Sequence, residues 1–254
     1  MTAAIAALFR HPIKGFTPEK LKLAALSPGN AFPGDRLYAL EDGPCGFDPE
    51  RPGFIPKQRF AVLAKIAEVA RAKTRLDDVT GVLHATAEGR PPFAGKLADP
   101  DGQAAFAVWV SELLGDAAEG PLRLIDGQGH RFLDHPLGHV SVINLASVRD
   151  LEQRLGRTLD PLRFRANVYV DGWPAWMEND WEGRRLSLGE VETEVFKPIV
   201  RCAAPSVDPT TAIRDLDIPA ELFRHYGHTL CGVYVQVKRG GVIKEGDAVS
   251  DPPP

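Results

Sequence analysis

Glycine and proline recur throughout this 254-residue chain. The 24 glycines and 22 prolines are spread along the sequence and do not cluster in one segment. Because both residues favour turns, their distribution predicts many short strands joined by turns. The clearest strand is Val191–Phe196, in which apolar and polar side chains largely alternate; we expect it to form a hairpin with Arg185–Leu188 and to end at Pro198.

Three segments are predicted to be helical. Gln103–Leu114 and Ser147–Leu155 carry apolar residues at helical spacing, with Ser147 as the expected N-cap and Gly156 as the end of the second helix. A third, short helix is expected at Pro219–His225. The remaining strands are expected at Ala3–Phe9, Leu21–Leu26, Leu37–Leu40, Leu63–Arg71, Arg75–Leu76, Val82–Ala85, Leu122–Ile125, His139–Asn144, Val168–Val170, Cys231–Val237, Val242–Ile243 and after Gly246–Asp247. The fold class is therefore mainly β with α, or α+β.

Composition excludes several classes of protein. A net charge of −4 argues against a general nucleic-acid binder, and no apolar run is long enough to span a membrane. Met1–Arg10 lacks the pattern of a secretion signal. The three cysteines are odd in number and far apart, which fits a reducing cytoplasm and no disulfide framework. We therefore expect a cytoplasmic protein with neither a nucleic-acid nor a membrane partner, and a frayed tail at Asp251–Pro254.

The pair Arg201–Cys202 follows the best-patterned strand and is the strongest chemical signal. A neighbouring cation favours the thiolate, which is both a nucleophile and a metal ligand. Thiolate sulfur suits thiophilic metals better than hard cations. The competing interpretation is that Cys202 is a small buried apolar residue. No CxxC and no Cys/His zinc spacing occurs, so a structural zinc or a local iron–sulfur motif is not expected.

Four basic residues are candidates for an anion site. Arg163 and Arg165 flank one phenylalanine, so on an extended chain they would share a face and converge on one anion. Lys14 and Arg36 lie beside glycines at strand–loop junctions, where residues are often positioned for ligands. The alternatives are a charge pair on an edge strand for the first two and solvated surface charges for the others.

Two loops are candidates for the rim of a site. Glu41–Gln58 is long and rich in proline and glycine, which makes it a possible lid or rim, and its Cys45 is more simply incidental. Trp173–Trp181 holds three tryptophans, which would line a substrate opening or plug the end of a barrel.

Five segments in the same order resemble the MOSC family, the domain named after the C-terminus of molybdenum-cofactor sulfurase. They are His11–Lys14, Gly34–Tyr38, Ser141–Ser147, Arg163–Asn167 and Arg201–Cys202 with Val207–Pro209, and the stretch from Leu230 to Asp247 also matches. The resemblance is to the branch of the mitochondrial amidoxime-reducing component and its bacterial relatives. It implies an N-terminal β-barrel-like domain over residues 1–118 packed with a MOSC β-barrel over residues 119–254.

The resemblance also implies a cofactor, molybdenum bound by molybdopterin, with Cys202 as the protein ligand of the metal and the catalytic residue. Lys14, Arg36, Arg163 and Arg165 are then candidates for binding the phosphate of the cofactor, because a phosphate needs fixed cationic donors. Ser141, Asn167 and Tyr234 can hydrogen-bond pterin heteroatoms or phosphate oxygens, and Arg201 belongs to the same site. No pyridoxal phosphate is expected.

The activity that the resemblance implies is a two-electron reduction of small N-hydroxylated or N-oxide compounds. The chain ends before a ferredoxin domain of the kind that some bacterial relatives carry. Electrons are therefore expected from an external electron-transfer protein, ferredoxin-like or a b-type cytochrome, and its reductase. Two alternatives remain open: a non-redox protein that stores or hands on the cofactor, and a sulfur carrier with a persulfide on Cys202.

Three positions depart from the family pattern. Gly15 and Val200 stand where family members often have hydroxyl residues, and the segment Asp208–Ala212 lacks a glycine expected near its end.

Overall fold

A closed seven-stranded β-barrel forms one half of the molecule in the computed structural model, which describes residues 3–250. Its strands follow each other around the barrel as β10, β9, β13, β12, β11, β15 and β1, and the pairing of β1 with β10 closes it. β2 extends from the outer edge of β1. The bounds are β1 Ala3–Arg10, β2 Glu19–Leu21, β9 Val140–Asn144, β10 Val168–Asp171, β11 Arg185–Leu188, β12 Val191–Val200, β13 Leu230–Arg239 and β15 Ala248–Ser250. The predicted α+β class with a barrel is confirmed.

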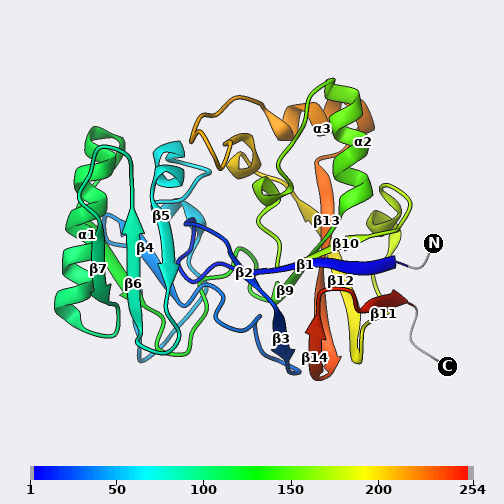
Figure 1. Cartoon of the computed structure of the whole chain (residues 1–254), viewed down its shortest axis with the longest axis horizontal. Helices are drawn as coiled ribbons and strands as arrows, with labels where there is room; N and C mark the ends of the chain where they lie inside the picture. The colour runs from blue at the N-terminus through cyan, green and yellow to red at the C-terminus, as the bar shows by residue number, and fades with distance from the viewer. Residues whose placement is uncertain (1–2, 251–254) are drawn as a thin grey trace.

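Valines fill the inside of the barrel, as the alternating pattern of the strands requires. Val142, Val170 and Val233 are at most 1% exposed. All five residues of β9 are buried, because its outer face lies under α2 (Leu145–Leu155) and α3 (Ile218–Tyr226), where Ile143 packs with Val148 and Leu222. Figure 1 shows the two helices side by side above the barrel.

The aromatic loop packs into the barrel and does not line an opening. Trp181 is 5% exposed within the core of the barrel, and Trp173 contacts it edge to face with ring centroids 4.8 Å apart. The Trp176 indole N–H donates to Asp150 of α2. Of the two sequence-based interpretations, the structure supports the plug.

The other half of the molecule is built from small sheets and one long helix (Figure 1). β4 pairs with β8, while β5, β6 and β7 form a three-stranded sheet on which α1 packs. β3 reaches the barrel side and pairs with β14. The bounds are β3 Leu23–Leu26, β4 Tyr38–Asp42, β5 Lys73–Leu76, β6 Val82–Thr86, β7 Phe93–Lys96, α1 Pro100–Leu114, β8 Leu122–Asp126 and β14 Gly241–Lys244. None of the helices in residues 3–250 is both long enough and apolar enough to cross a membrane.

Several predicted elements are wrong for identifiable reasons. Leu63–Arg71 is no strand; it forms turns and the 3₁₀ helix η2, since its apolar residues do not alternate. Helix α2 is capped by Asn144, whose side chain accepts from the Ala146 N–H at 3.0 Å, and the predicted cap Ser147 lies inside the helix. β12 continues past Pro198 to Val200, because bulges interrupt its register with β13 there. β7 was not predicted, and the expected strand Leu21–Leu26 is split between β2 and β3.

Six short 3₁₀ helices complete the fold of residues 3–250. They are η1 Lys57–Arg59, η2 Ala67–Arg71, η3 Gly115–Ala117, η4 Pro161–Phe164, η5 Met177–Asp180 and η6 Ala204–Ser206. Two of them, η4 and η6, adjoin the site described next.

Candidate functional site

Cys202 lies at a pocket of about 220 Å³ where the barrel meets the other half of the molecule. A narrow extension of about 40 Å³ shares several wall residues with it and reaches Lys14. Of the nine residues predicted for the site, those that line the main pocket are Arg36, Ser141, Arg163, Arg165, Arg201, Cys202 and Tyr234. The fold therefore brings together residues that are far apart in the sequence, such as Arg36 and Tyr234.

The backbone before Cys202 is held by Arg201. Its Nε and one terminal nitrogen donate to the Cys231 carbonyl at 2.8 and 2.5 Å, and the other donates to the Phe164 carbonyl at 2.8 Å. The guanidinium also lies over the Phe164 ring, 5.3 Å from its centroid. Arg201 thus fixes the end of β12 against β13 and η4, and within residues 3–250 no hydrogen bond or ion pair joins it to the Cys202 thiol.

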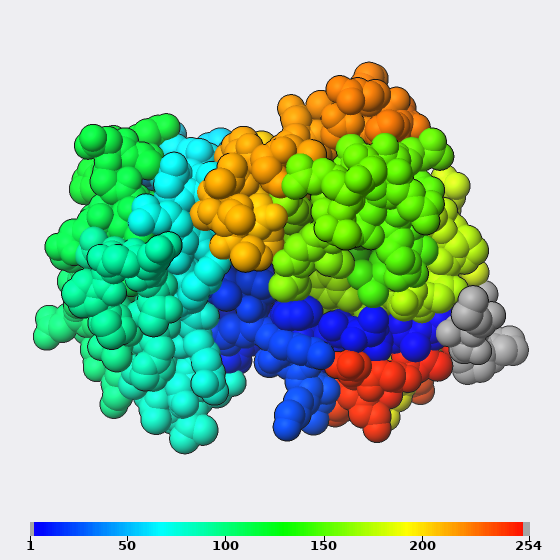
Figure 2. Space-filling model, turned by 45° about the horizontal axis from the view of Figure 1, so that its top comes forward, coloured from blue at the N-terminus to red at the C-terminus, as the bar shows by residue number. Residues whose placement is uncertain are grey.

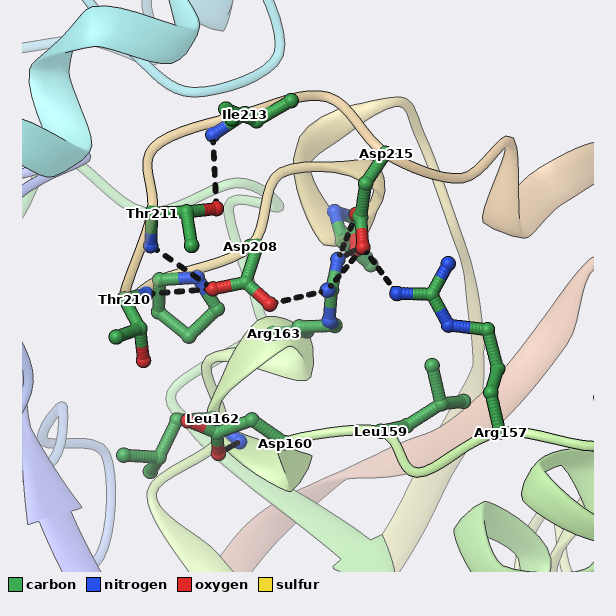
Figure 3. A network of polar contacts seen from close by, with 12 residues as sticks. Arg157, Leu159, Asp160, Leu162, Arg163, Asp208, Thr210, Thr211, Ile213 and Asp215 are labelled. Atoms are coloured by element: carbon green, nitrogen blue, oxygen red, sulfur yellow. Dashed lines mark hydrogen bonds and ion pairs between the residues drawn. The ribbon is translucent and has the colours of Figure 1, made fainter.

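The backbone around Phe164 is not extended, so the predicted reason for the convergence of Arg163 and Arg165 is wrong, although both side chains line the pocket. Arg163 lies within the 3₁₀ helix η4, whereas Arg165 follows that helix and has a left-handed backbone with φ of 52°. Arg163 is 2% exposed and donates to Asp208 at 2.6 Å and to Asp215 at 2.8 Å (Figure 3). Its charge is balanced by these carboxylates, which belong to the segment that follows Cys202.

Arg165 differs from Arg163 because its guanidinium has no hydrogen-bond or ion-pair partner anywhere in residues 3–250. Burial and, second, the nearby charge of Arg36 lower the pKa of Arg165 to about 10. An arginine held in this way, without an acceptor, at the wall of a pocket is suited to bind an anion.

Lys14 and Arg36 complete a mostly cationic wall. The Lys14 ammonium is buried and donates to the Phe132 carbonyl at 2.8 Å and to Asp134 at 2.6 Å, and burial lowers its pKa. Arg36 forms a close ion pair with Asp35, whose carboxylate also accepts from the backbone N–H of His11 at 2.6 Å. These contacts hold both cations in place while leaving positive charge in excess.

Ser141 and Tyr234 line the pocket, whereas Asn167 lies behind it. The Ser141 hydroxyl donates to the Asn167 amide oxygen at 2.8 Å, and the backbone N–H of Asn167 donates back to the hydroxyl at 3.1 Å. Asn167 is 1% exposed and therefore orients Ser141 from beneath. Burial, followed by the charge of Asp134, raises the pKa of Tyr234 to about 12.

Sequence reasoning missed four polar residues that line this pocket. They are Lys57, Asp134, His135 and Lys197. Lys57 belongs to the loop Glu41–Gln58, and no other residue of that loop lines the main pocket or its extension. No pattern in the sequence marks the other three, of which Asp134 and His135 lie in the loop between β8 and β9 and Lys197 lies on β12.

The segment between Cys202 and α3 ties the two halves together. Arg214 donates to the Ala203 carbonyl at 2.7 Å and to the Leu63 carbonyl at 2.9 Å, and Lys73 donates to the Pro209 carbonyl at 2.6 Å. Figure 2 shows this orange segment lying between the cyan surface of the N-terminal half and the green surface of the barrel half. The segment therefore fixes where Cys202 lies relative to the cations of the N-terminal half.

The backbone conformation at Ala212 explains why the family pattern has a glycine near this position. Its φ of 59° lies in the left-handed region, which costs an L-residue free energy and costs glycine little. Ala212→Gly should raise the free energy of unfolding by roughly 0.5–1 kcal/mol, measured by urea denaturation. Ala105→Gly in the exposed face of α1 is the control and should lower it by about 1 kcal/mol. A loss of stability in both variants would contradict the strain at Ala212.

Two family models match nearly the whole chain. The model "MOSC N-terminal beta barrel domain" matches residues 2–120, and the model "MOSC domain" matches residues 130–250. The chain belongs to the MOSC family.

Named relatives match about half of the chain or less. The chain is 30% identical to mitochondrial amidoxime reducing component 2 of Bos taurus over 43% of its length and 36% of the bovine protein. It is 28% identical to mitochondrial amidoxime-reducing component 1 of Homo sapiens over 42% of its length and 35% of the human protein. It is 32% identical to molybdenum cofactor sulfurase of Drosophila erecta over 52% of its length and 17% of the fly protein. The YUAD protein from Bacillus subtilis resembles the fold with a TM-score of 0.49 and 15% identity, over 98% of this chain and 94% of that chain.

The residues at the pocket fit an anionic cofactor whose metal takes one protein thiolate. No group of three His, Cys, Asp or Glu side chains within residues 3–250 is arranged to hold a metal ion. A metal bound through Cys202 would thus need its other ligands from a non-protein group. The unpartnered guanidinium of Arg165 in the same pocket supplies the donor that an anionic group of such a cofactor requires.

Proposed function

We propose that this chain is a molybdenum-cofactor oxidoreductase that reduces small N-hydroxylated or N-oxide compounds. The observation that carries the proposal is that the Cys202 thiol and the unpartnered Arg165 guanidinium line one pocket. Membership of the MOSC family and the names of the relatives support the choice of molybdopterin.

Each side chain has a distinct part in this proposal. Cys202 is the protein ligand of the metal, and Arg165, Arg36 and Lys14 bind the phosphate of molybdopterin. The Ser141 hydroxyl, whose proton is donated to Asn167, accepts a hydrogen bond from the cofactor, and the Tyr234 hydroxyl donates one. Arg201 and Arg163 act through the backbone around Cys202, because Nε and both terminal nitrogens of Arg201 and the two terminal nitrogens of Arg163 are already bonded to protein acceptors. We also propose the division into domains 1–118 and 119–254.

The reaction that we propose is balanced by two electrons and two protons. An amidoxime, R–C(NH₂)=N–OH, loses its N–O bond and gives the amidine R–C(NH₂)=NH and one water molecule. When bound, the cofactor supplies the two-electron redox chemistry. The protein residues bind and orient, and a separate electron-transfer protein with its reductase supplies the electrons.

The choice of reductant tests this proposal. We expect cofactor-loaded protein to reduce benzamidoxime with reduced methyl viologen, and to be inactive with NADH alone, because the sequence has neither a GxGxxG fingerprint nor a CxxC pair. Formation of benzamidine, followed by chromatography, is the measurement. A fully loaded preparation that reduces no N-hydroxylated compound, N-oxide or S-oxide with the viologen would overturn the proposal.

A further inference from the structure

Lys197 is a cationic residue of the main pocket that lies apart from the cations proposed to bind the phosphate. Lys197 of β12 lines the main pocket, and its ammonium has no hydrogen-bond or ion-pair partner within residues 3–250. The narrow extension, by contrast, is lined by Lys14, Arg36, Lys57 and Arg165, and not by Lys197. The cations of the pocket therefore fall into two groups, one at the extension and one at Lys197.

Lys57 belongs to the first group and Lys197 to the second. The charge of Lys57 acts on Lys14 and on Asp134, which places it beside them. Burial and, second, the nearby charge of Lys197 lower the pKa of His135, which places Lys197 near the imidazole. Besides Lys197, two arginines line only the main pocket. These are Arg163 and Arg201, which are bonded to carboxylates and carbonyls of the protein. Lys197 is thus the cation on this side that lacks an acceptor in the described residues.

His135 adds a second donor beside Lys197. Its Nδ1 accepts from the backbone N–H of Leu137 at 3.1 Å, so the neutral ring carries its proton on Nε2. The ring lies 5.2 Å from Phe196 and 6.1 Å from Tyr234, measured between centroids. Tyr234 is also the Cα partner of Lys197 in the β12–β13 ladder. Lys197 and His135 therefore both lie beside Tyr234 in the wall of the pocket.

We propose that Lys197 and His135 bind a carboxylate on the substrate, so that the enzyme prefers anionic N-hydroxylated compounds. The inference rests on the proposed function and adds to it the class of substrate. A planar carboxylate accepts one bond from an ammonium and one from an imidazole N–H, and these charge-assisted bonds would hold the reducible N–O group inside the pocket.

The test compares 4-carboxybenzamidoxime with neutral benzamidoxime as substrates, with reduced methyl viologen as reductant. We expect a KM about tenfold lower for the carboxylate, the effect of one charge-assisted contact. In Lys197→Met that KM should rise by about tenfold while the KM of benzamidoxime and the molybdenum content stay unchanged. Lys22→Met, which removes an equal charge far from the pocket, should change neither the KM of either compound nor the molybdenum content.

Binding measured by calorimetry separates the failure of this inference from that of the proposed function. If neither compound is reduced but Lys197→Met weakens binding of 4-carboxybenzamidoxime by about tenfold, the carboxylate site stands and the reductase function fails. If both compounds are reduced with equal KM in the wild type and the variant, the carboxylate site is refuted. A loss of molybdenum in Lys197→Met would also overturn it, since Lys197 would then hold the cofactor.

Discussion

Cys202→Ser should lose most of its bound molybdenum when the protein is produced in a host that synthesises molybdopterin. A serine hydroxyl is a poor ligand for a thiophilic metal, and the pocket has no second cysteine among its lining residues. The fold should be retained, because Cys202 is half-buried and packs in none of the core clusters. Molybdenum per chain and the absorption spectrum of the purified protein are the measurements.

Cys45→Ser is the matched control for this experiment. Cys45 is also half-buried, but it lies in the Pro/Gly-rich loop and does not line the pocket. It should keep the molybdenum content and spectrum of the wild type. Equal metal content and equal spectra in Cys202→Ser and the wild type would rule out Cys202 as the ligand.

Arg163→Met should destabilise the fold, because it breaks a buried ion-pair network beside the site. It leaves the carboxylates of Asp208 and Asp215 without their shared partner, and these are 23% and 20% exposed. Breaking a fully buried ion pair costs about 3–5 kcal/mol, so partial exposure reduces the expected loss to roughly 2–3 kcal/mol. For a chain of this size the midpoint of thermal unfolding should fall by roughly 5–10 °C.

Arg157→Met tests whether the burial of Arg163 is the cause. Arg157 donates to the same Asp215 carboxylate at 2.6 Å, but its side chain is 45% exposed (Figure 3). An exposed pair contributes little, so the loss should stay below about 1 kcal/mol. Equal losses in the two variants would show that the buried network does not hold the segment after Cys202.

Local patterns predicted the helices and the hairpin but not the closure of the barrel. The apolar spacing of α1 and α2 and the alternation in β12 are visible within a few residues of sequence. Closure depends on the pairing of β1 with β10, in which Ile5 lies opposite Val170. No local signal marks partners so far apart in sequence.

The sequence predicted most of the residues of the candidate site but not their arrangement in space. The motifs of the family named Cys202 and Arg165, and the pocket contains both. The extended backbone assumed for Arg163 was wrong, because the proline of η4 and the left-handed Arg165 turn the chain. The acidic partners of Arg163 are Asp208 and Asp215, which lie between Cys202 and α3. No pattern in the sequence pairs them with Arg163. Lys197 was overlooked because β12 was expected to end beside it, at Pro198.

The metal and pterin content of the wild-type protein tests the central claim most directly. Protein produced in a host that synthesises molybdopterin should contain about one molybdenum atom per chain, together with the fluorescence of an oxidised pterin. A protein that carried neither, and instead held a persulfide on Cys202, would contradict the account and identify a sulfur carrier.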